Sequence, residues 1–162
     1  EEQAYKEKGR FAGQDFFGIF SYNFLEGNPA RALEEVNSIA ISQSLAQKIF
    51  GDAPALGKML RVDDREEFKV TGVFEDVPAH ASIRFDFILP VEEYIRRNDW
   101  LENWGNNALR MFVLLDEKAS YQDLNNKLKT SSGSIAKIQT QTFFSSPTKI
   151  CTSTLTFRTE SW

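Results

Sequence analysis

Residues 37–87 read NSIAISQSLAQKIFGDAPALGKMLRVDDREEFKVTGVFEDVPAHASIRFDF, and this stretch carries the most ordered set of local signals in the chain. The apolar run at 38–41 is typical of a short strand, and Ser42 after it is a residue type that favours helix N-caps. Apolar residues at helical spacing follow, and Gly51 is a natural helix stop. A strand that runs directly into a helix is therefore predicted here.

Two more strands are predicted downstream, at 59–62 and 68–74, with a turn at Asp63 between them. In the second strand apolar residues partly alternate with polar ones, as expected for a sheet with one face in water. The strand–helix–strand segment at 38–62 predicts a compact crossover unit whose helix packs on one face of that sheet.

The rest of the chain supplies further short elements. Helices are predicted at 15–20, 29–35, 91–97 and 120–129, and strands at 109–115, 135–144 and 150–157, with Pro147 marking a break. Phe16, Phe17 and Phe20 give the first of these helices an aromatic face that we expect in the core. The pattern predicts an α+β fold: a mixed β-sheet with helices packed mainly on one face, including the strand–helix–strand unit.

Composition limits the classes of function. The chain has 162 residues, 41% of them hydrophobic, and its 14 phenylalanines can fill the core of one domain. A net charge of −4 argues against binding to nucleic acid, which usually requires a basic patch. A single cysteine excludes an internal disulfide or a cysteine-based metal cluster. No apolar run approaches the ~20 residues that cross a bilayer.

The segment from Gly51 to Lys58 superficially resembles a phosphate-binding loop. That loop needs four residues between its glycines, whereas Gly51 and Gly57 are separated by five. One of the five is Pro54, which has no N–H to offer a phosphate. A turn punctuated by glycines is the favoured interpretation, and no cofactor or metal is expected.

Other groups that could carry chemistry are isolated. His80, the only histidine, has no acidic neighbour in sequence, and an enzyme would need a cleft that joins it to two carboxylates. Cys151 lies in a strand-like run and is expected to be half-buried. Carboxylates that surround the predicted turn, at positions 63, 64, 66 and 67, are expected to be solvated. Asp15, Asp76 and Asp86 are expected to cap backbone N–H groups or to face water.

The order of these motifs resembles one known family. The residues that carry the resemblance are Asp15-Phe16-Phe17, Phe20, Phe24-Leu25-Glu26-Gly27-Asn28-Pro29, Ala32-Leu33, the segment from Ser44 to Asp52, Pro54, Gly57-Lys58, Val70-Thr71-Gly72-Val73, Asp76-Val77-Pro78, Ser82-Ile83, Phe85-Asp86, the segment from Met111 to Leu115, and Pro147-Thr148-Lys149-Ile150. As an ordered set they are similar to the MacB-like periplasmic core domain of ABC transporter permeases. Residues 10–130 carry most of the similarity and 130–162 little. Ala81, Thr148 and Cys151 depart from the family pattern.

The resemblance implies that the domain is not catalytic. Such domains lie between membrane helices of a permease, on the periplasmic side of the bacterial inner membrane. They relay ATP-driven motion of those helices to a periplasmic partner or substrate, in efflux or in the handling of lipoproteins or peptides. The implied partners are the membrane helices and ATPase of a dimeric parent and a periplasmic adaptor protein. Residues 1–162 are expected to form a single extracytoplasmic domain, excised from the membrane protein.

A candidate partner-binding loop follows at 100–107. Tryptophan is enriched at binding hot spots, so Trp100, Trp104 and Asn106 are proposed to contact a partner; alternatively, the two rings close the end of the sheet. A stand-alone ligand-binding or sensory module is the alternative function, and it would require a saturable small-molecule pocket.

Overall fold

A computed structural model describes residues 5–63, 66–81, 83–102, 111–131, 137–145 and 150–158. The chain forms two compact units, Glu1–Asn98 and Asp99–Trp162. The first contains β1 (Gly9–Ala12), α1 (Phe16–Ile19), β2 (Phe24–Gly27), β3 (Ser38–Ser42), α2 (Gln43–Phe50), β4 (Met59–Val62), β5 (Glu66–Phe74), β6 (Phe87–Pro90) and α3 (Val91–Arg96). The second contains a 3-10 helix (Asp99–Glu102), β7 (Met111–Leu114), α4 (Tyr121–Ser131), β8 (Lys137–Ser145) and β9 (Ile150–Arg158).

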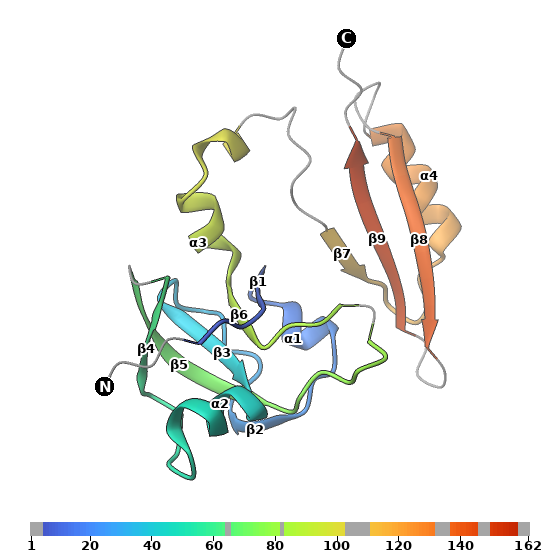
Figure 1. Ribbon diagram of the computed structural model, residues 1–162. Helices are drawn as coiled ribbons and strands as arrows, with labels where there is room; N and C mark the ends of the chain where they lie inside the picture. Colours follow the sequence, from blue (N-terminus) through green and yellow to red (C-terminus); the bar gives the residue numbers. More distant parts are fainter. Residues whose placement is uncertain are drawn as a thin grey trace. The chain divides into compact units, whose positions relative to one another are not determined.

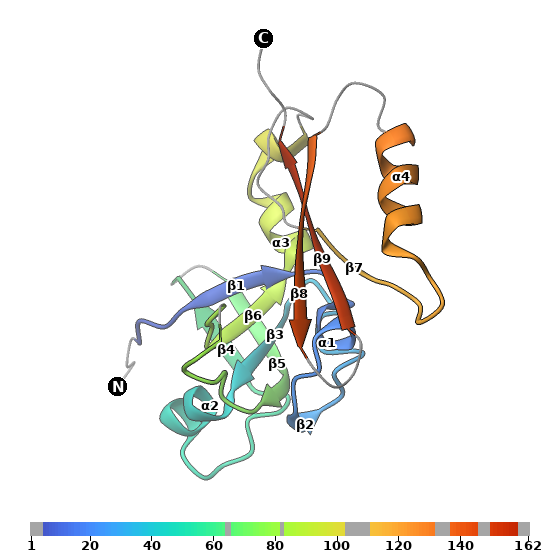
Figure 2. The same ribbon diagram turned by 90° about the vertical axis from the view of Figure 1, so that its right-hand side faces the viewer.

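The first unit is built on a six-stranded sheet in the order β1-β6-β3-β5-β2, with β4 also paired to β5 (Figure 1). Strand β3 is parallel to β5 and antiparallel to β6, so the sheet is mixed as predicted. At the sheet edge β1 runs parallel to β6, with Gly9 opposite Phe87 and Ala12 opposite Pro90 (Figure 2). The first and last strands of the unit are therefore neighbours.

The predicted strand–helix junction at Ser42 is confirmed. The Ser42 hydroxyl accepts a hydrogen bond from the Leu45 N–H at 3.3 Å, which satisfies one of the free donors at the start of α2. Gly51 ends the helix with φ of 62°, a conformation that glycine adopts without strain. All five residues of β3 are buried, as befits a central strand.

Apolar side chains cover both faces of the sheet. On one face lies an aromatic cluster, which consists of Phe16, Phe17, Tyr22, Phe24, Phe74 and Phe85, packed with small aliphatic residues such as Ala40. On the other lies an aliphatic cluster, which consists of Ile39, Ile41, Leu45, Val70, Val73 and Leu89, together with Phe68. Because successive residues of a strand point to opposite faces, Ala40 falls in one cluster and its two isoleucine neighbours in the other. Helix α1 covers the aromatic face and α2 the aliphatic face.

The helix predicted at 29–35 is wrong. Residues 29–37 form successive turns, in which the Arg31 N–H donates to the Asn28 carbonyl at 3.0 Å. The Asn28 side chain also accepts from the Ala30 N–H at 3.0 Å, and the Glu34 N–H donates to the Arg31 carbonyl, three residues back, at 3.3 Å, as in a turn.

The second unit contains a three-stranded antiparallel sheet in the order β7-β9-β8. Strands β8 and β9 pair along their whole length, from Lys137 opposite Arg158 to Ser145 opposite Ile150, which confirms both predicted strands. The predicted buried strand at 109–115 needs correction, because β7 begins at Met111 and its Leu114 side chain is 51% exposed. Helix α4 begins as predicted after Ser120, whose hydroxyl accepts from the Asp123 N–H at 3.4 Å.

Candidate functional site

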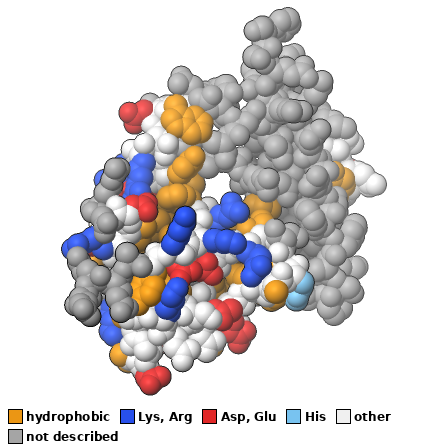
Figure 3. Space-filling view, viewed as in Figure 1, with side chains coloured by type: hydrophobic (Ala, Val, Ile, Leu, Met, Phe, Trp, Pro, Cys, Tyr) orange, Lys and Arg blue, Asp and Glu red, His pale blue; other side chains and the backbone are white. Residues whose placement is uncertain are grey.

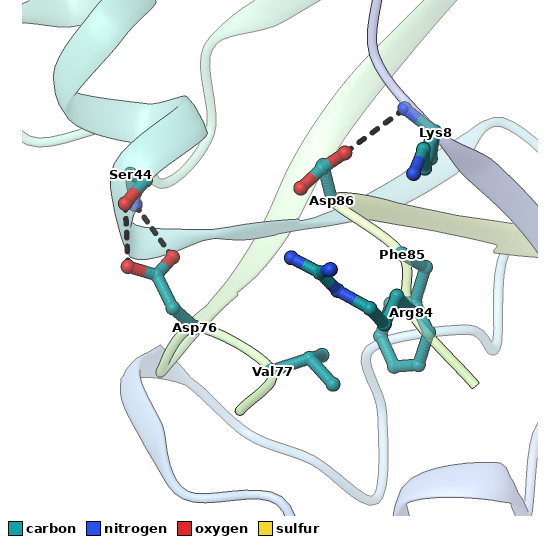
Figure 4. Close-up of a pocket in the computed structure, with 7 residues that line it drawn as sticks. All are labelled: Lys8, Ser44, Asp76, Val77, Arg84, Phe85 and Asp86. Carbon is teal, nitrogen blue, oxygen red and sulfur yellow. Dashed lines mark hydrogen bonds between the residues drawn. The ribbon is translucent and has the colours of Figure 1, made fainter. Parts of the chain in front are cut away.

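A small polar cavity opens on the first unit. Its volume is about 280 Å³, and seven residues line it: Lys8, Ser44, Asp76, Val77, Arg84, Phe85 and Asp86 (Figure 4). They come from four segments, namely the approach to β1, the start of α2, the segment after β5 and the segment before β6. The cavity therefore marks the place where these segments are fastened together.

Asp76 binds the N-terminus of α2. Its carboxylate accepts a hydrogen bond from the Ser44 N–H at 2.9 Å and a second, short one from the Ser44 hydroxyl. The free N–H groups of a first helical turn and the positive end of the helix dipole both favour a carboxylate in this position. The expectation that Asp76 caps backbone N–H groups is confirmed.

Asp86 fastens the N-terminal segment to the sheet. Its carboxylate accepts from the Lys8 N–H at 3.0 Å, and its own N–H donates to the Lys8 carbonyl at 2.7 Å. Its carbonyl accepts from the Ser42 N–H at 2.8 Å, where β3 meets α2. One residue thus joins the beginning of β1, the start of β6 and the end of β3.

Two cationic side chains at the cavity have no partner among the described residues. Lys8 and Arg84 are exposed, and neither side chain forms a hydrogen bond or an ion pair with the residues that the structure describes. Figure 4 shows the Arg84 guanidinium extending between Asp76 and Asp86, with no bond to either carboxylate. The cavity thus presents free cations beside carboxylates that are already engaged by backbone N–H groups.

A second charged group lies at α3. The side chain of Glu93 is fully buried, and it accepts hydrogen bonds from Arg96 Nε at 2.9 Å and Arg97 Nε at 2.5 Å. The same two arginines reach Glu66 of β5 at 3.0 and 2.6 Å. The network therefore ties α3 to the long central strand.

The network shifts the pKa values of Glu66 and Arg97. The carboxyl group of Glu93 lowers the pKa of Glu66 through a side-chain hydrogen bond, and the guanidinium groups of Arg97 and Arg96 lower it further. The pKa of Arg97 is raised, chiefly by its hydrogen bond to Glu93 and also by Glu66. Glu66 had been expected to be simply solvated, and its ion pairs correct that expectation.

Of the residues predicted to bind a partner, only Trp100 lies within the described ranges. It belongs to the 3-10 helix at Asp99–Glu102, and 44% of it is exposed. Trp104 and Asn106 lie outside the described residues, so the predicted grouping of the three stays a prediction.

The isolated reactive groups stay isolated in the parts of the chain that are described. His80 is exposed in a turn and does not line the cavity that contains Asp76 and Asp86. Cys151 lies in β9, as predicted, although its side chain is not among those described. No group of three or more His, Cys, Asp or Glu side chains suited to a metal ion occurs in the described ranges. Nor does any helix in those ranges combine the length and apolarity needed to span a membrane.

Sequence reasoning missed Arg84, Lys8 and Glu93. A signal for Glu93 was present, because arginines follow it at three and four residues, the spacing at which helical side chains meet. No comparable signal marks Arg84 or Lys8, which are 76 positions apart in the sequence and meet only in the fold.

Comparisons with known proteins place this geometry in a family. The sequence model of the family described as "MacB-like periplasmic core domain" matches residues 3–131. No curated protein matches the sequence.

Two crystal structures share the fold. A domain assigned to a permease protein of Porphyromonas gingivalis has a TM-score of 0.64 at 24% sequence identity, covering 99% of this chain and 70% of that one. The periplasmic region of MacB from Actinobacillus actinomycetemcomitans has a TM-score of 0.51 at 14% identity, covering 74% of this chain and 53% of that one. The α+β fold with a mixed sheet is the fold of these domains.

Proposed function

The chain belongs to the family of MacB-like periplasmic core domains, and on this premise we propose that it is a non-catalytic relay. As a member of that family it is an extracytoplasmic domain of an ABC-type transporter permease. The relay would carry ATP-driven motion of the membrane helices to a periplasmic partner or substrate. Export, or the handling of lipoproteins or peptides, is the class of process proposed.

The attachment of the N-terminal segment to the sheet is the observation that carries this proposal. Lys8 exchanges hydrogen bonds with Asp86 at 3.0 and 2.7 Å, and β1 then pairs with β6 over four residues. Just before β1, Glu7 forms an ion pair with Lys48 of α2 at 2.5 Å. A pull along this segment loads several bonds at once, so that the whole sheet must follow.

The body attached to this segment is suited to move as one piece. Both faces of the sheet are covered by packed side chains, and close packing resists local deformation. The Glu93 network fixes α3 to β5, so the last helix of the first unit is also tied to the central strand. Motion of β1 would therefore be transmitted to α3, because little of it would be absorbed by local opening of the structure.

The chemistry of the cavity supports the non-catalytic part of the proposal. Asp76 and Asp86 accept backbone hydrogen bonds that hold the fold, and His80 is not among the residues that line the cavity. A general acid or base needs a partner within hydrogen-bond reach of a substrate. The groups that could serve in this way are used for fastening.

The partners proposed follow from the family. They are the membrane helices and the ATPase domain or subunit of a dimeric parent, together with a periplasmic adaptor protein. Residues 1–162 are proposed to act as one extracytoplasmic domain, and Trp100, with Trp104 and Asn106, remains a proposed partner contact.

A flexible insertion tests the relay in the parent permease. We would place Gly-Ser-Gly-Ser immediately before Tyr5 and attach a donor fluorophore to a cysteine at Val36, which is 42% exposed. Cys151→Ser removes the only cysteine of residues 1–162, and any cysteine elsewhere in the permease is replaced by serine in the same background. Energy transfer to a lipid-headgroup acceptor in proteoliposomes then reports movement relative to the bilayer.

Without the insertion, ATP should change the energy transfer. With it, the change should largely disappear while ATP hydrolysis continues, because the slack absorbs the motion. The matched control carries the same insertion between Asp52 and Ala53, in a surface turn off the proposed path, and should keep the change. A label that never responds to ATP, or an insertion without effect, would refute the relay.

The alternative, a stand-alone ligand-binding or sensory module, draws on the cavity. At about 280 Å³ the cavity lies just below the 300–1,000 Å³ typical of small-molecule sites, and its lining is mostly polar. A saturable small ligand that raises the melting temperature of the isolated chain would favour this alternative.

A further inference from the structure

Arg84 in the cavity differs from most of the other described arginines, because it forms no ion pair with the residues that the structure describes. Four of the six arginines with described side chains pair with a glutamate of this chain: Arg31, Arg61, Arg96 and Arg97. The two that do not are Arg84, in the cavity, and Arg10, two residues after the cavity residue Lys8. Figure 3 shows Lys and Arg side chains gathered on one face around a few acidic ones.

Arg84 stays unpaired although two carboxylates line the same cavity. Asp76 is held by the N–H and hydroxyl groups of Ser44, and Asp86 by the N–H of Lys8. These donors, and the positive end of the α2 dipole at Asp76, offset much of the negative charge of the carboxylates. Two full positive charges remain on side chains that are free to reorient.

We propose that this cavity binds the carboxylate of an aspartate or glutamate side chain presented by a partner protein. Arg84 would supply paired N–H donors in the fork geometry that matches a carboxylate, and Lys8 would supply a second positive charge. The cavity volume of about 280 Å³ suits a side chain better than a whole ligand. Val77 and Phe85 provide an apolar wall for its methylene groups.

A lipid phosphate fits this site less well than a carboxylate. The chain carries a net charge of −4, which opposes approach to an anionic bilayer surface. The inference rests on the proposed function in one respect, because it names the chemistry by which the relay would engage its periplasmic partner.

Nuclear magnetic resonance on the ¹⁵N-labelled 162-residue chain provides the test. The probe is acetyl-Gly-Glu-Gly-amide, and its uncharged match is acetyl-Gly-Gln-Gly-amide. The Glu peptide should shift the backbone signals of Lys8, Ser44 and Asp86 and the Nε–H signal of Arg84, and the shifts should saturate at millimolar concentration. The Gln peptide should leave them unchanged.

Two variants locate the site. Arg84→Gln should weaken binding of the Glu peptide at least about ten-fold, because it removes the charge-assisted bonds. Arg61→Gln makes the same charge change on β4, away from the cavity, and should bind the peptide like the parent chain. Because both arginines are substantially exposed, both variants should keep the dispersed spectrum of the folded chain.

Inorganic phosphate and phosphatidylglycerol vesicles are added in separate titrations to test whether the cavity is a phosphate site instead of a carboxylate site. Shifts of the same residues by phosphate at lower concentration than the Glu peptide, or loss of their signals on the vesicles, would overturn the proposal in favour of a phosphate site. Absence of saturable shifts with the Glu peptide would overturn it outright. Either failure would leave the relay standing, because the insertion experiment at Tyr5 does not involve the cavity.

Discussion

The two faces of the six-stranded sheet are covered in different ways. The aliphatic face is covered by α2, a regular helix with an N-cap and a glycine stop. The aromatic face is covered by the four-residue α1 and by irregular chain, and its cohesion comes from rings that contact each other. The ring centroids of Phe17 and Phe24 are 4.7 Å apart, with the rings edge to face, and those of Phe74 and Phe85 are 5.5 Å apart.

The cavity described above lies beside only one of the two faces. The cavity borders the aromatic face, because Phe85 belongs to the aromatic cluster and Val77 packs against it. Irregular chain can turn polar side chains toward solvent where a helix would present a fixed stripe. In the proposed function both faces would stiffen the sheet, and the proposed partner site would lie beside the aromatic face.

The largest expected effect compares one phenylalanine from each face. Phe74→Ala and Phe68→Ala each remove a fully buried ring, and each should lower the free energy of unfolding by about 3–5 kcal/mol. Phe74 should be the more costly by about 1 kcal/mol, because it also has aromatic neighbours at 5.5–6.3 Å. Urea unfolding measures both, and a larger loss for Phe68→Ala would break the distinction between the faces.

Phe87 adds a graded case to this comparison. Phe87, at the start of β6, is only partly buried and packs against the aliphatic cluster. Phe87→Ala should therefore cost less than Phe74→Ala. Equal losses would show that partial exposure is a poor guide to the packing at the β1–β6 edge.

The next effect tests a charged fastening that belongs to neither cluster. Glu93→Ala should lower the free energy of unfolding by about 2–3 kcal/mol, somewhat below the usual cost of breaking a buried ion pair. The reduction is expected because Arg96 and Arg97 keep side-chain exposures of 60% and 28% and can be solvated. Glu92→Ala, at the exposed neighbouring position, serves as the control in the same urea titration. Identical curves for the two variants would show that the Glu93 network does not fasten α3.

A smaller effect probes the space beneath the aromatic face. A Cβ atom at Gly72 of β5 would come within 2.4 Å of the Phe24 ring, so Gly72→Ala should destabilise by about 1–3 kcal/mol. Gly18→Ala is the matched control, because a Cβ atom there meets nothing within 4 Å and alanine favours the helix. Thermal unfolding should separate the two, and a neutral Gly72→Ala would mean that the aromatic cluster repacks easily.

The smallest effect depends on pH. Because the folded-state pKa of Glu66 lies below its ordinary value of 4.5, the stability contributed by its ion pairs is complete above that value and is lost as pH falls through the folded-state pKa. Glu66→Gln should therefore lower stability at neutral pH, and the gap to the parent chain should close in acid. Glu67→Gln removes the same charge at the next position of β5, where the partner Arg61 is 3.6 Å away, and serves as the control for the loss of a surface carboxylate. A Glu66 gap that widens in acid would contradict the sign of the pKa shift.

Local signals made the aliphatic face predictable. The Ser42 cap, the Gly51 stop and the alternation in β5 each depend on a few neighbouring residues, and the elements formed where those signals indicate. The turns at 29–37 were not predicted, because the bond from the Ala30 N–H to the Asn28 side chain can begin either a turn or a helix, and the local sequence does not separate the two.

The candidate site was less predictable, because it depends on pairing between distant segments. Asp76 and Asp86 were expected to cap N–H groups, but nothing in the sequence indicates that their donors belong to Ser44 and Lys8. The pairing of β1 with β6 creates the cavity, and the burial of Glu93 likewise depends on where α3 packs. Such features follow from tertiary structure and leave only faint traces in spacing.

The central claim is that the N-terminal segment and the sheet form one rigid body, and hydrogen exchange of the native chain tests it most directly. The Asp86 N–H donates to Lys8 at 2.7 Å, and the Val70 N–H in the middle of the sheet donates to Lys58 at 2.8 Å. The account predicts that both amides exchange only through the same large opening, with equal free energies. An Asp86 amide that exchanges through a small local opening, while Val70 stays protected, would contradict it.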